Sequence, residues 1–411
     1  MSQINKVLIV GAGIAGLSIA IALRKRGVVV EIFERTPELS EVGAAISVAP
    51  NSARVLLSFG FDPKRSRATD AGPQYEYNKD GVVVDSLDLR DIFELLRIAT
   101  SDRDESWGPP AMLRLGFNII RVDCDSGVIV SDKGERFQGD LIIGADGVKS
   151  VIRQEITGRM DEPSVYSGHS AFRSLYNIEE LKADPELRVF VNEIKMEDWV
   201  GRDGRRCLLY PCRDNTLLNL FAPVFWEASQ SVESWRANGK ASDLAEKFKE
   251  FPKPLQKLLL KDPSPGLWQI RDRNPVHGWH KGKALLIGDA AHPMLPRIVH
   301  RYTPQILSLI NIYIDQGQGG AQAIEDAASL PIFLLDTPPD MSLAARLQRF
   351  EEFRYPRVTA IQERSRQQKE GPKQREGKLP SIEMWSQIDK QVSYNVVREA
   401  KNAVLELSGS K

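Results

Sequence analysis

The 411-residue chain lacks several features that would assign a function class at once. Its 55 basic and 55 acidic residues balance to a formal charge of zero, which recommends neither nucleic acid nor an acidic membrane surface as a partner. No apolar run reaches the length of a membrane span, and no repeat or low-complexity tract occurs. The opening MSQINK leads directly into a predicted strand without a signal peptide. We therefore expect a cytoplasmic protein that is long enough for two domains.

Cysteine and histidine are scarce, and their spacing does not suit a metal. Cys124, Cys207 and Cys212 are the three cysteines; they show no metal or redox spacing and are interpreted as reduced core thiols. His277 and His280 lie close together in HGWH, but no carboxylate or cysteine accompanies them. We expect a surface loop there, and no metal site.

The first stretch that carries chemistry has the pattern of a dinucleotide-binding unit. An apolar run at 7–10 predicts a buried parallel strand, and Gly11, Gly13 and Gly16 follow as G-x-G-x-x-G before a predicted helix at 14–26. The first glycine permits a tight turn, the second lets backbone approach a pyrophosphate, and the third lets the helix pack against the strand. The helix N-terminus offers N–H groups to the phosphates.

An acidic residue follows at the position where a ribose needs one. The second predicted strand, 28–33, leads into Glu34. A carboxylate there accepts hydrogen bonds from both ribose hydroxyls and repels a 2′-phosphate. The unit is therefore predicted to hold an adenosine without that phosphate, as in FAD or NAD.

Two further strand-and-turn units exceed what an NAD dehydrogenase needs. A predicted strand at 141–143 is followed by Asp146 in GADG and by Arg153, which could act as a fork donor to a pyrophosphate. Another at 284–287 is followed by Asp289, placed to hold a ribityl or ribose hydroxyl at the carboxyl edge of the sheet. Each aspartate could instead cap a helix. Taken together, the three units indicate an FAD enzyme.

On these residues the chain resembles the class A flavoprotein monooxygenases, in particular the salicylate-hydroxylase-like enzymes of fungi and bacteria. The resemblance covers nearly the whole chain. It implies the hydroxybenzoate-hydroxylase fold, bound FAD, NADH or NADPH as reductant, and insertion of oxygen from O₂ into an aromatic ring through a flavin C4a-hydroperoxide. The matching segments are the GxGxxG unit with Glu34 and Arg35, EVGAAISVAPNSARVL, the DGxxSxxR unit from Asp146 to Arg153, SGHSAFRSLY, LLYPCR, LWQIRDRNPVHGW, GDAAHPMLP and FEEFRYPRVTAIQERSR.

The resemblance also implies further contacts to the flavin. It adds Arg35, and Ala45 from the EVGAAISV stretch, to the FAD-binding residues. It starts a helix at Gly319 and Gly320, whose N-terminus would stabilise negative charge on reduced flavin. It places Pro293 at the junction of flavin and substrate.

The predicted fold is α/β, a Rossmann-like FAD-binding domain with an inserted antiparallel-sheet substrate domain and C-terminal helices. Strand-like alternation occurs in LRVFVNEI, RCLLYPCR and TLLNLFAPVFW. The expected FAD domain is 1–72, 88–160 and 275–370, the substrate domain is 73–87 and 161–274, and 371–411 form a linker and a terminal helix at 382–407.

A phenol is best bound as phenolate, and two residues of the predicted substrate sheet suit that oxygen. Arg173 and Tyr210 both lie on expected strands and could hold it jointly. The alternatives are a surface ion pair for Arg173 and a core position for Tyr210. His292 is interpreted as structural. The expected partners are the aromatic substrate, O₂ and NAD(P)H, with no nucleic acid and no membrane span, in a monomer or homodimer.

Two departures from the family pattern concern the flavin. Residues 297–315, an Ile-, Leu- and Tyr-rich stretch, separate HPMLP from the Gly-rich helix start, which follows at once in the family; we interpret them as translated intron sequence. Ahead of Phe93 the family's His-Arg-x-Asp-Leu segment, whose arginine contacts FAD, is missing, and Arg90 or Arg97 would have to substitute. Three hypotheses therefore stand: an aromatic hydroxylase, a flavin epoxidase or tailoring monooxygenase of secondary metabolism, and an inactive product of an aberrantly spliced gene.

Overall fold

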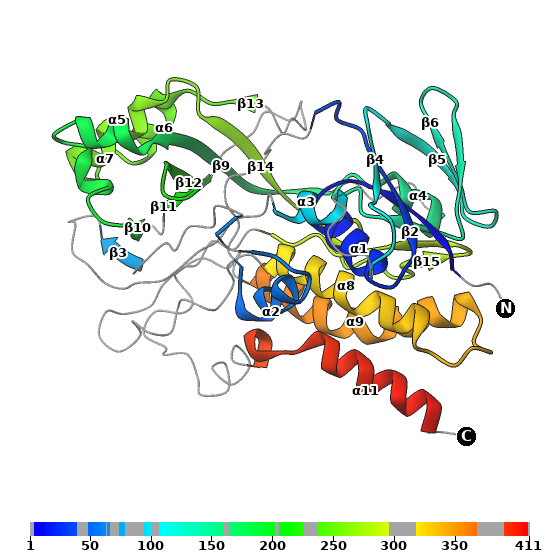
Figure 1. The fold of residues 1–411 in the computed structure, drawn as a ribbon. Helices are drawn as coiled ribbons and strands as arrows, with labels where there is room; N and C mark the ends of the chain where they lie inside the picture. The colour runs from blue at the N-terminus through cyan, green and yellow to red at the C-terminus, as the bar shows by residue number, and fades with distance from the viewer. Residues whose placement is uncertain are drawn as a thin grey trace.

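The computed structural model describes residues 4–38, 48–62, 64–65, 74–78, 94–100, 107–158, 164–201, 205–225, 237–295, 318–367 and 390–409. Within them, two large sheets lie at opposite ends of the molecule, with a stack of helices beneath one of them (Figure 1). The predicted fold class is confirmed: a Rossmann-like unit, an antiparallel sheet and C-terminal helices are all present.

The six-stranded sheet is the Rossmann-like unit. Its central strands are parallel and consist almost entirely of buried apolar residues, as expected when both faces of a parallel sheet are covered. The order is β15 (His280–Lys281), β16 (Ala284–Leu286), β8 (Leu141–Gly144), β1 (Lys6–Val10), β2 (Val29–Glu34) and β4 (Met112–Leu115).

Helices and a small sheet enclose this unit. Figure 1 shows the helix stack, in which α8 packs against α1, α9 and α11. The helices are α1 (Ile14–Arg24), α2 (Pro50–Ser58), α3 (Glu94–Thr100), α4 (Val151–Thr157), α8 (Gln318–Leu335), α9 (Leu343–Gln367) and α11 (Val396–Gly409), with the short turn η2 (Gly288–Ala290). The three-stranded sheet is β5 (Ile119–Asp123), β6 (Val128–Ser131) and β7 (Arg136–Gln138).

The second large sheet is antiparallel except where β10 pairs with β3. Its strands come from 74–78 and from between 165 and 272. The order is β13 (Ala237–Asn238), β14 (Gly266–Asp272), β9 (Val165–Asn177), β12 (Leu217–Phe225), β11 (Arg206–Cys212), β10 (Met196–Val200) and β3 (Gln74–Asn78).

The two faces of this sheet differ in character. Alternate residues such as Phe172, Leu209 and Leu220 form an apolar core beneath α5 (Ile178–Ala183), α6 (Ala241–Lys247) and α7 (Lys253–Lys261). Because side chains alternate along a strand, the residues between them point to the other face. That second face carries Arg173 and Tyr210.

Two details of the predicted secondary structure were wrong. LRVFVNEI is no strand: it contains the short 3-10 helix η1 (Arg188–Phe190). Leu187 and Phe190, three residues apart, are both buried there, and Asp184 accepts the N–H of Leu187 to start the turn. The terminal helix predicted at 382–407 is interrupted before Val396, where Asn395 accepts the N–H of Arg398. Residues 382–389 lie outside the described part.

Candidate active site

The three glycines of the first loop have different surroundings. A Cβ on Gly11 would lie 2.3 Å from the carbonyl oxygen of Ala145, and one on Gly16 would lie 1.9 Å from the carbonyl oxygen of Gly11. Both positions therefore require glycine for packing. A Cβ on Gly13 would meet nothing within 4 Å. The loop is thus open at Gly13, the position where the motif brings backbone close to a pyrophosphate.

Glu34 closes the loop from the end of β2. One carboxylate oxygen accepts the N–H of Ala12 at 2.9 Å, and the other accepts the N–H and hydroxyl of Thr36, each at 3.0 Å. A carboxylate has about four acceptor sites, so Glu34 can tie the loop to the strand and still receive a ribose hydroxyl. The neighbouring Arg35 is exposed.

Asp146 is both a helix cap and an unsatisfied acceptor. Its Oδ2 accepts the N–H groups of Val151 and Ile152 at 2.7 and 3.3 Å, so the cap considered as an alternative does exist. Its Oδ1 is buried and has no partner among the described residues. Burial raises the pKa of Asp146, and hydrogen bonds from Ser150 and Ile152 offset part of that rise. A buried acceptor without a donor suits a ligand hydroxyl.

Arg153 ties two turns together. It is 1% exposed, and its terminal nitrogens donate to the carbonyl oxygens of Ala290, at 2.7 Å, and Val148, at 2.5 Å. These bonds join the turn of Asp146 to the turn of Asp289. They use two of the five N–H groups of the guanidinium, so the fork donation to a pyrophosphate stays a prediction.

Asp289 lies in the short turn η2, which follows β16. Its side chain is exposed, yet the surrounding protein is dense enough that desolvation raises its pKa, with His292 and Arg153 lowering it in part. The preceding Gly288 has φ of +58°, and a Cβ there would lie 2.8 Å from Cβ of Ala15 at the start of α1. The third turn is therefore packed against the first helix.

The start of α8 is the fourth segment of the candidate site, after the glycine-rich loop and the turns of Asp146 and Asp289. The helix begins at Gln318, within the glycine-rich segment expected from the sequence. A Cβ on Gly319 would lie 4.0 Å from Oδ1 of Asp289 and 3.9 Å from Cβ of Met294. Gly319 and Gly320 are partly exposed. The N–H groups of this helix start thus lie beside the Asp289 turn.

The sequence did not reveal a buried charged cluster beneath these turns. Glu325 and Asp326 of α8 are fully buried and bind Arg354 of α9, with Arg357 also on Glu325. His292, interpreted as structural, is 2% exposed and bonds to Asp326 at 2.6 Å. One feature of the sequence could have predicted this cluster: the acidic pair Glu325 and Asp326 lies inside the apolar stretch AIEDAASL.

These residues fit FAD. Open space at Gly13, the partnerless Oδ1 of Asp146, the accessible carboxylate of Asp289 and the start of α8 come from four separate segments and adjoin one another. They supply what a dinucleotide needs: room for phosphates, acceptors for hydroxyls and a helix N-terminus. Ala45, the 297–315 segment and the region before Phe93 lie outside the described residues.

Arg173 and Tyr210 lie together on the face of the antiparallel sheet opposite α5, α6 and α7. Burial raises the pKa of Tyr210, and the charge and hydrogen bonding of Arg173 lower it in part, with a smaller contribution from Asn219. The guanidinium carbon of Arg173 lies 4.5 Å from the ring centre of Trp268. Arg173 is half-buried and makes no salt bridge with a described residue, unlike the surface ion pair considered as an alternative.

Pro293 is held by α9. Its carbonyl oxygen accepts the Nε2 of Gln362 at 2.8 Å, and the same nitrogen donates at 3.1 Å to the carbonyl of Arg273, just after β14. Gln362 is 1% exposed. One buried amide therefore connects the segment that follows Asp289 to the end of a substrate-sheet strand.

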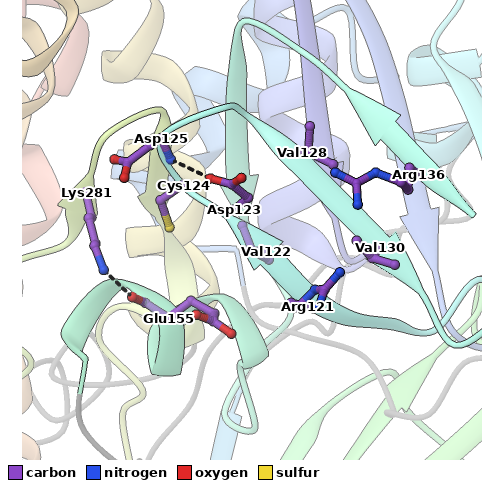
Figure 2. Close-up of a pocket in the computed structure, with 10 residues that line it drawn as sticks. All are labelled: Arg121, Val122, Asp123, Cys124, Asp125, Val128, Val130, Arg136, Glu155 and Lys281. Carbon is purple, nitrogen blue, oxygen red and sulfur yellow. Dashed lines mark hydrogen bonds between the residues drawn. The ribbon is translucent and has the colours of Figure 1, made fainter. Parts of the chain in front are cut away.

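A charged cavity of about 380 Å³ lies elsewhere (Figure 2). Its wall includes Arg121, Asp123 and Arg136 from the small sheet, with Lys281 of β15, which pairs with Ala284 at the start of β16. The cavity is thus at the amino edge of the parallel strands, whereas ligands bind at the carboxyl edge in such sheets. Burial raises the pKa of Cys124 in its wall to about 11. Among the described helices none is long and apolar enough to cross a membrane.

Comparisons with known proteins agree with this geometry. Residues 9–61 match the family model of an NAD(P)-binding Rossmann-like domain, and residues 125–298 match that of an FAD binding domain. The chain is 31% identical over 381 residues to the FAD-dependent monooxygenase cfoG of Aspergillus candidus, covering 87% of this chain and 83% of that protein.

Two further relatives extend the match to nearly the full length. Hispidin-3-hydroxylase of Neonothopanus nambi is 28% identical, with 97% of this chain and 96% of that protein aligned. The crystal structure of CtdE in complex with FAD has a TM-score of 0.77 at 21% identity, covering 99% of this chain and 100% of that one. The latter likeness concerns the fold.

Proposed function

Because the chain belongs to the class A FAD-dependent aromatic monooxygenases, we propose that it uses NADH or NADPH and O₂ to hydroxylate a small phenolic or aromatic-acid substrate. The observation that carries this proposal is the pair formed by Arg173 and Tyr210. The pair combines a cation and a neutral donor on a sheet face that no described helix covers.

The turns at the carboxyl edge of the parallel sheet hold the cofactor in this account. Gly13 gives room for the pyrophosphate, and the remaining acceptor site of Glu34 receives one adenosine ribose hydroxyl. Asp146 and Asp289 receive hydroxyls elsewhere along the dinucleotide. The start of α8 at Gly319 places N–H groups where negative charge on reduced flavin needs them.

Arg173 and Tyr210 bind and orient the substrate oxygen. A guanidinium stabilises a phenolate by charge, and the Tyr210 hydroxyl donates to the same oxygen because burial keeps it protonated. An electron-rich ring held this way is poised for oxygen transfer, while bound FAD supplies the activation of O₂. Pro293, fixed by Gln362, delimits the space between flavin and substrate.

The test uses the FAD-loaded protein with NADPH or NADH and two probes, hispidin and 3-hydroxybenzoate. We expect reductant oxidation that a phenolic probe stimulates, with one atom of ¹⁸O from ¹⁸O₂ in the product. Tyr210→Phe should lower kcat/KM by about tenfold or more, the value of a lost hydrogen bond to a charged oxygen. Tyr176→Phe removes a buried hydroxyl from the other face of the same sheet and serves as the matched control.

Two outcomes count against the proposal. Equal losses in Tyr210→Phe and Tyr176→Phe would remove Tyr210 from the substrate site. Oxygenation of an isolated alkene in preference to both phenols would favour an epoxidase.

A further inference from the structure

One buried carboxylate joins the two segments that flank Asp289 to the helix beside it. Asp326 of α8 is fully buried. Its Oδ2 accepts the N–H of Gly288 at 2.9 Å and bonds to Nε2 of His292 at 2.6 Å. Gly288 and His292 stand on either side of Asp289 in the chain, so Asp326 holds the turn that presents Asp289 at both ends.

The other oxygen of Asp326 reaches a different helix. Oδ1 accepts Nε of Arg354 at 2.8 Å, which connects the turn through α8 to α9. Burial alone would raise the pKa of Asp326, but His292 and Arg354 lower it below its usual value. The side chain is therefore ionised at neutral pH and accepts all three hydrogen bonds.

The adjacent acid, Glu325, has a different set of partners. It accepts hydrogen bonds from Arg354, Arg357 and Asn51. None of its described hydrogen bonds reaches residues 288–293. The two neighbouring carboxylates share one arginine and equal burial, and only Asp326 contacts the turn.

His292 is fixed on two sides. Because Nε2 is bonded to the carboxylate of Asp326, only Nδ1 of the ring remains for a second partner. That Nδ1 is buried and has no partner among the described residues. The ring centre lies 5.4 Å from that of Trp279. The imidazole is thus held between a carboxylate and an indole, and it cannot rotate without losing the bond to Asp326.

We propose that Asp326 is a positioning residue of the FAD site, which fixes the Gly288–His292 turn so that Asp289 lies against the start of α8. The proposal rests on FAD binding and is independent of which aromatic substrate the enzyme takes. The competing explanation is that Asp326 only stabilises the packing of α8 on α9, as Glu325 does.

The experiment compares Asp326→Asn with Glu325→Gln in the full-length protein. Each change neutralises one fully buried partner of Arg354, so both should lower the thermal midpoint of the apoprotein. Only Asp326→Asn should raise the FAD dissociation constant, by roughly tenfold or more, as is typical when a residue that orients a ligand contact is lost. At saturating FAD only Asp326→Asn should alter the visible circular dichroism of the bound flavin.

His292→Asn provides a milder variant should Asp326→Asn fail to fold. It keeps the bonds from Asp326 to Gly288 and Arg354 while the imidazole is removed. We expect a smaller loss of thermal midpoint than in Asp326→Asn, with a changed flavin dichroism. The proposal is overturned if Asp326→Asn and Glu325→Gln weaken FAD binding equally, or if His292→Asn leaves both FAD affinity and flavin dichroism unchanged.

Discussion

Gly319, at the start of α8, lies against Asp289, with its Cβ position 4.0 Å from the carboxylate Oδ1. The chain between them includes 297–315, the stretch that departs from the family pattern. Its flanks already meet, since Met294 is also close to Gly319. The described residues on both sides of this stretch therefore lie close together.

Deletion of 297–315 should consequently leave the FAD site intact. Pro296, Gln316 and Gly317 would remain as the connection, and three residues span up to about 10 Å when extended. We expect the deletion variant to bind FAD at least as tightly as the full chain, measured by fluorescence titration of the apoprotein. A deletion variant that folds but binds FAD more weakly would show that 297–315 belong to the site.

The glycines of the first loop should respond differently to a side chain. Gly13→Ala places a methyl group in open space, so the apoprotein should lose only about 0.5–1 kcal/mol, the difference between glycine and alanine at an N-cap. FAD binding should weaken by about tenfold or more because the pyrophosphate needs that space. Titration with FAD and thermal unfolding of the apoprotein measure the two quantities.

Gly16→Ala is the matched comparison. Its Cβ would lie 1.9 Å from the backbone oxygen of Gly11, a contact that only backbone movement can relieve. Overpacking of this kind costs typically about 1–3 kcal/mol or more. Equal stability of the two variants would contradict the different roles assigned to these glycines.

The titration of Tyr210 supplies a pH test. Burial raises its pKa above the usual value near 10, so the hydroxyl stays protonated through the neutral range. The stability contributed by the neutral phenol is present below the unfolded pKa and is lost as the pH rises through the higher folded pKa. Tyr210→Phe should therefore lower kcat/KM by the same factor at every pH below about 10. The shape of the pH profile of kcat/KM should not change in that range. Loss of an alkaline limb in Tyr210→Phe would show that Tyr210 ionises during turnover.

Loss of the Gln362 amide should lower the free energy of unfolding, in addition to any effect on the position of Pro293. Gln362→Leu leaves the buried carbonyl oxygen of Pro293 without its donor, whereas the carbonyl oxygen of Arg273 still accepts from the guanidinium of Arg366. Unsatisfied buried groups cost about 1–3 kcal/mol, which urea unfolding would measure. Gln348→Leu, at an exposed position of the same helix, should change stability by no more than about 0.5 kcal/mol. A similar loss in both variants would contradict a specific role for Gln362.

Local sequence patterns were sufficient to predict the strands and turns of the Rossmann-like unit. Strands β1, β8 and β16 are short apolar runs followed by turn residues, and turn chemistry of this kind is readable in sequence. The hydrogen-bond partners that a side chain finds in the folded protein could not be predicted in the same way. Arg153 has the spacing expected for a phosphate contact, but the sequence did not show that it also donates to backbone carbonyls that only the folded chain brings near.

The errors in the secondary structure predicted from the sequence have the same cause, which is the influence of contacts in the folded chain. In LRVFVNEI the apolar residues suit a strand, but Leu187 and Phe190 face the core at helical spacing once the turn at Asp184 forms. Asp326 and Gln362 are polar residues inside apolar helix faces. Their importance depends on partners from distant segments, which no periodicity reveals.

The visible absorbance spectrum of the purified full-length protein tests the central claim most directly, because every role assigned above depends on one FAD held by the four converging segments. The account predicts flavin bands at close to one FAD per chain, lost on Gly13→Val and bleached by NADH or NADPH. A folded protein that is colourless and takes up no added FAD would contradict it.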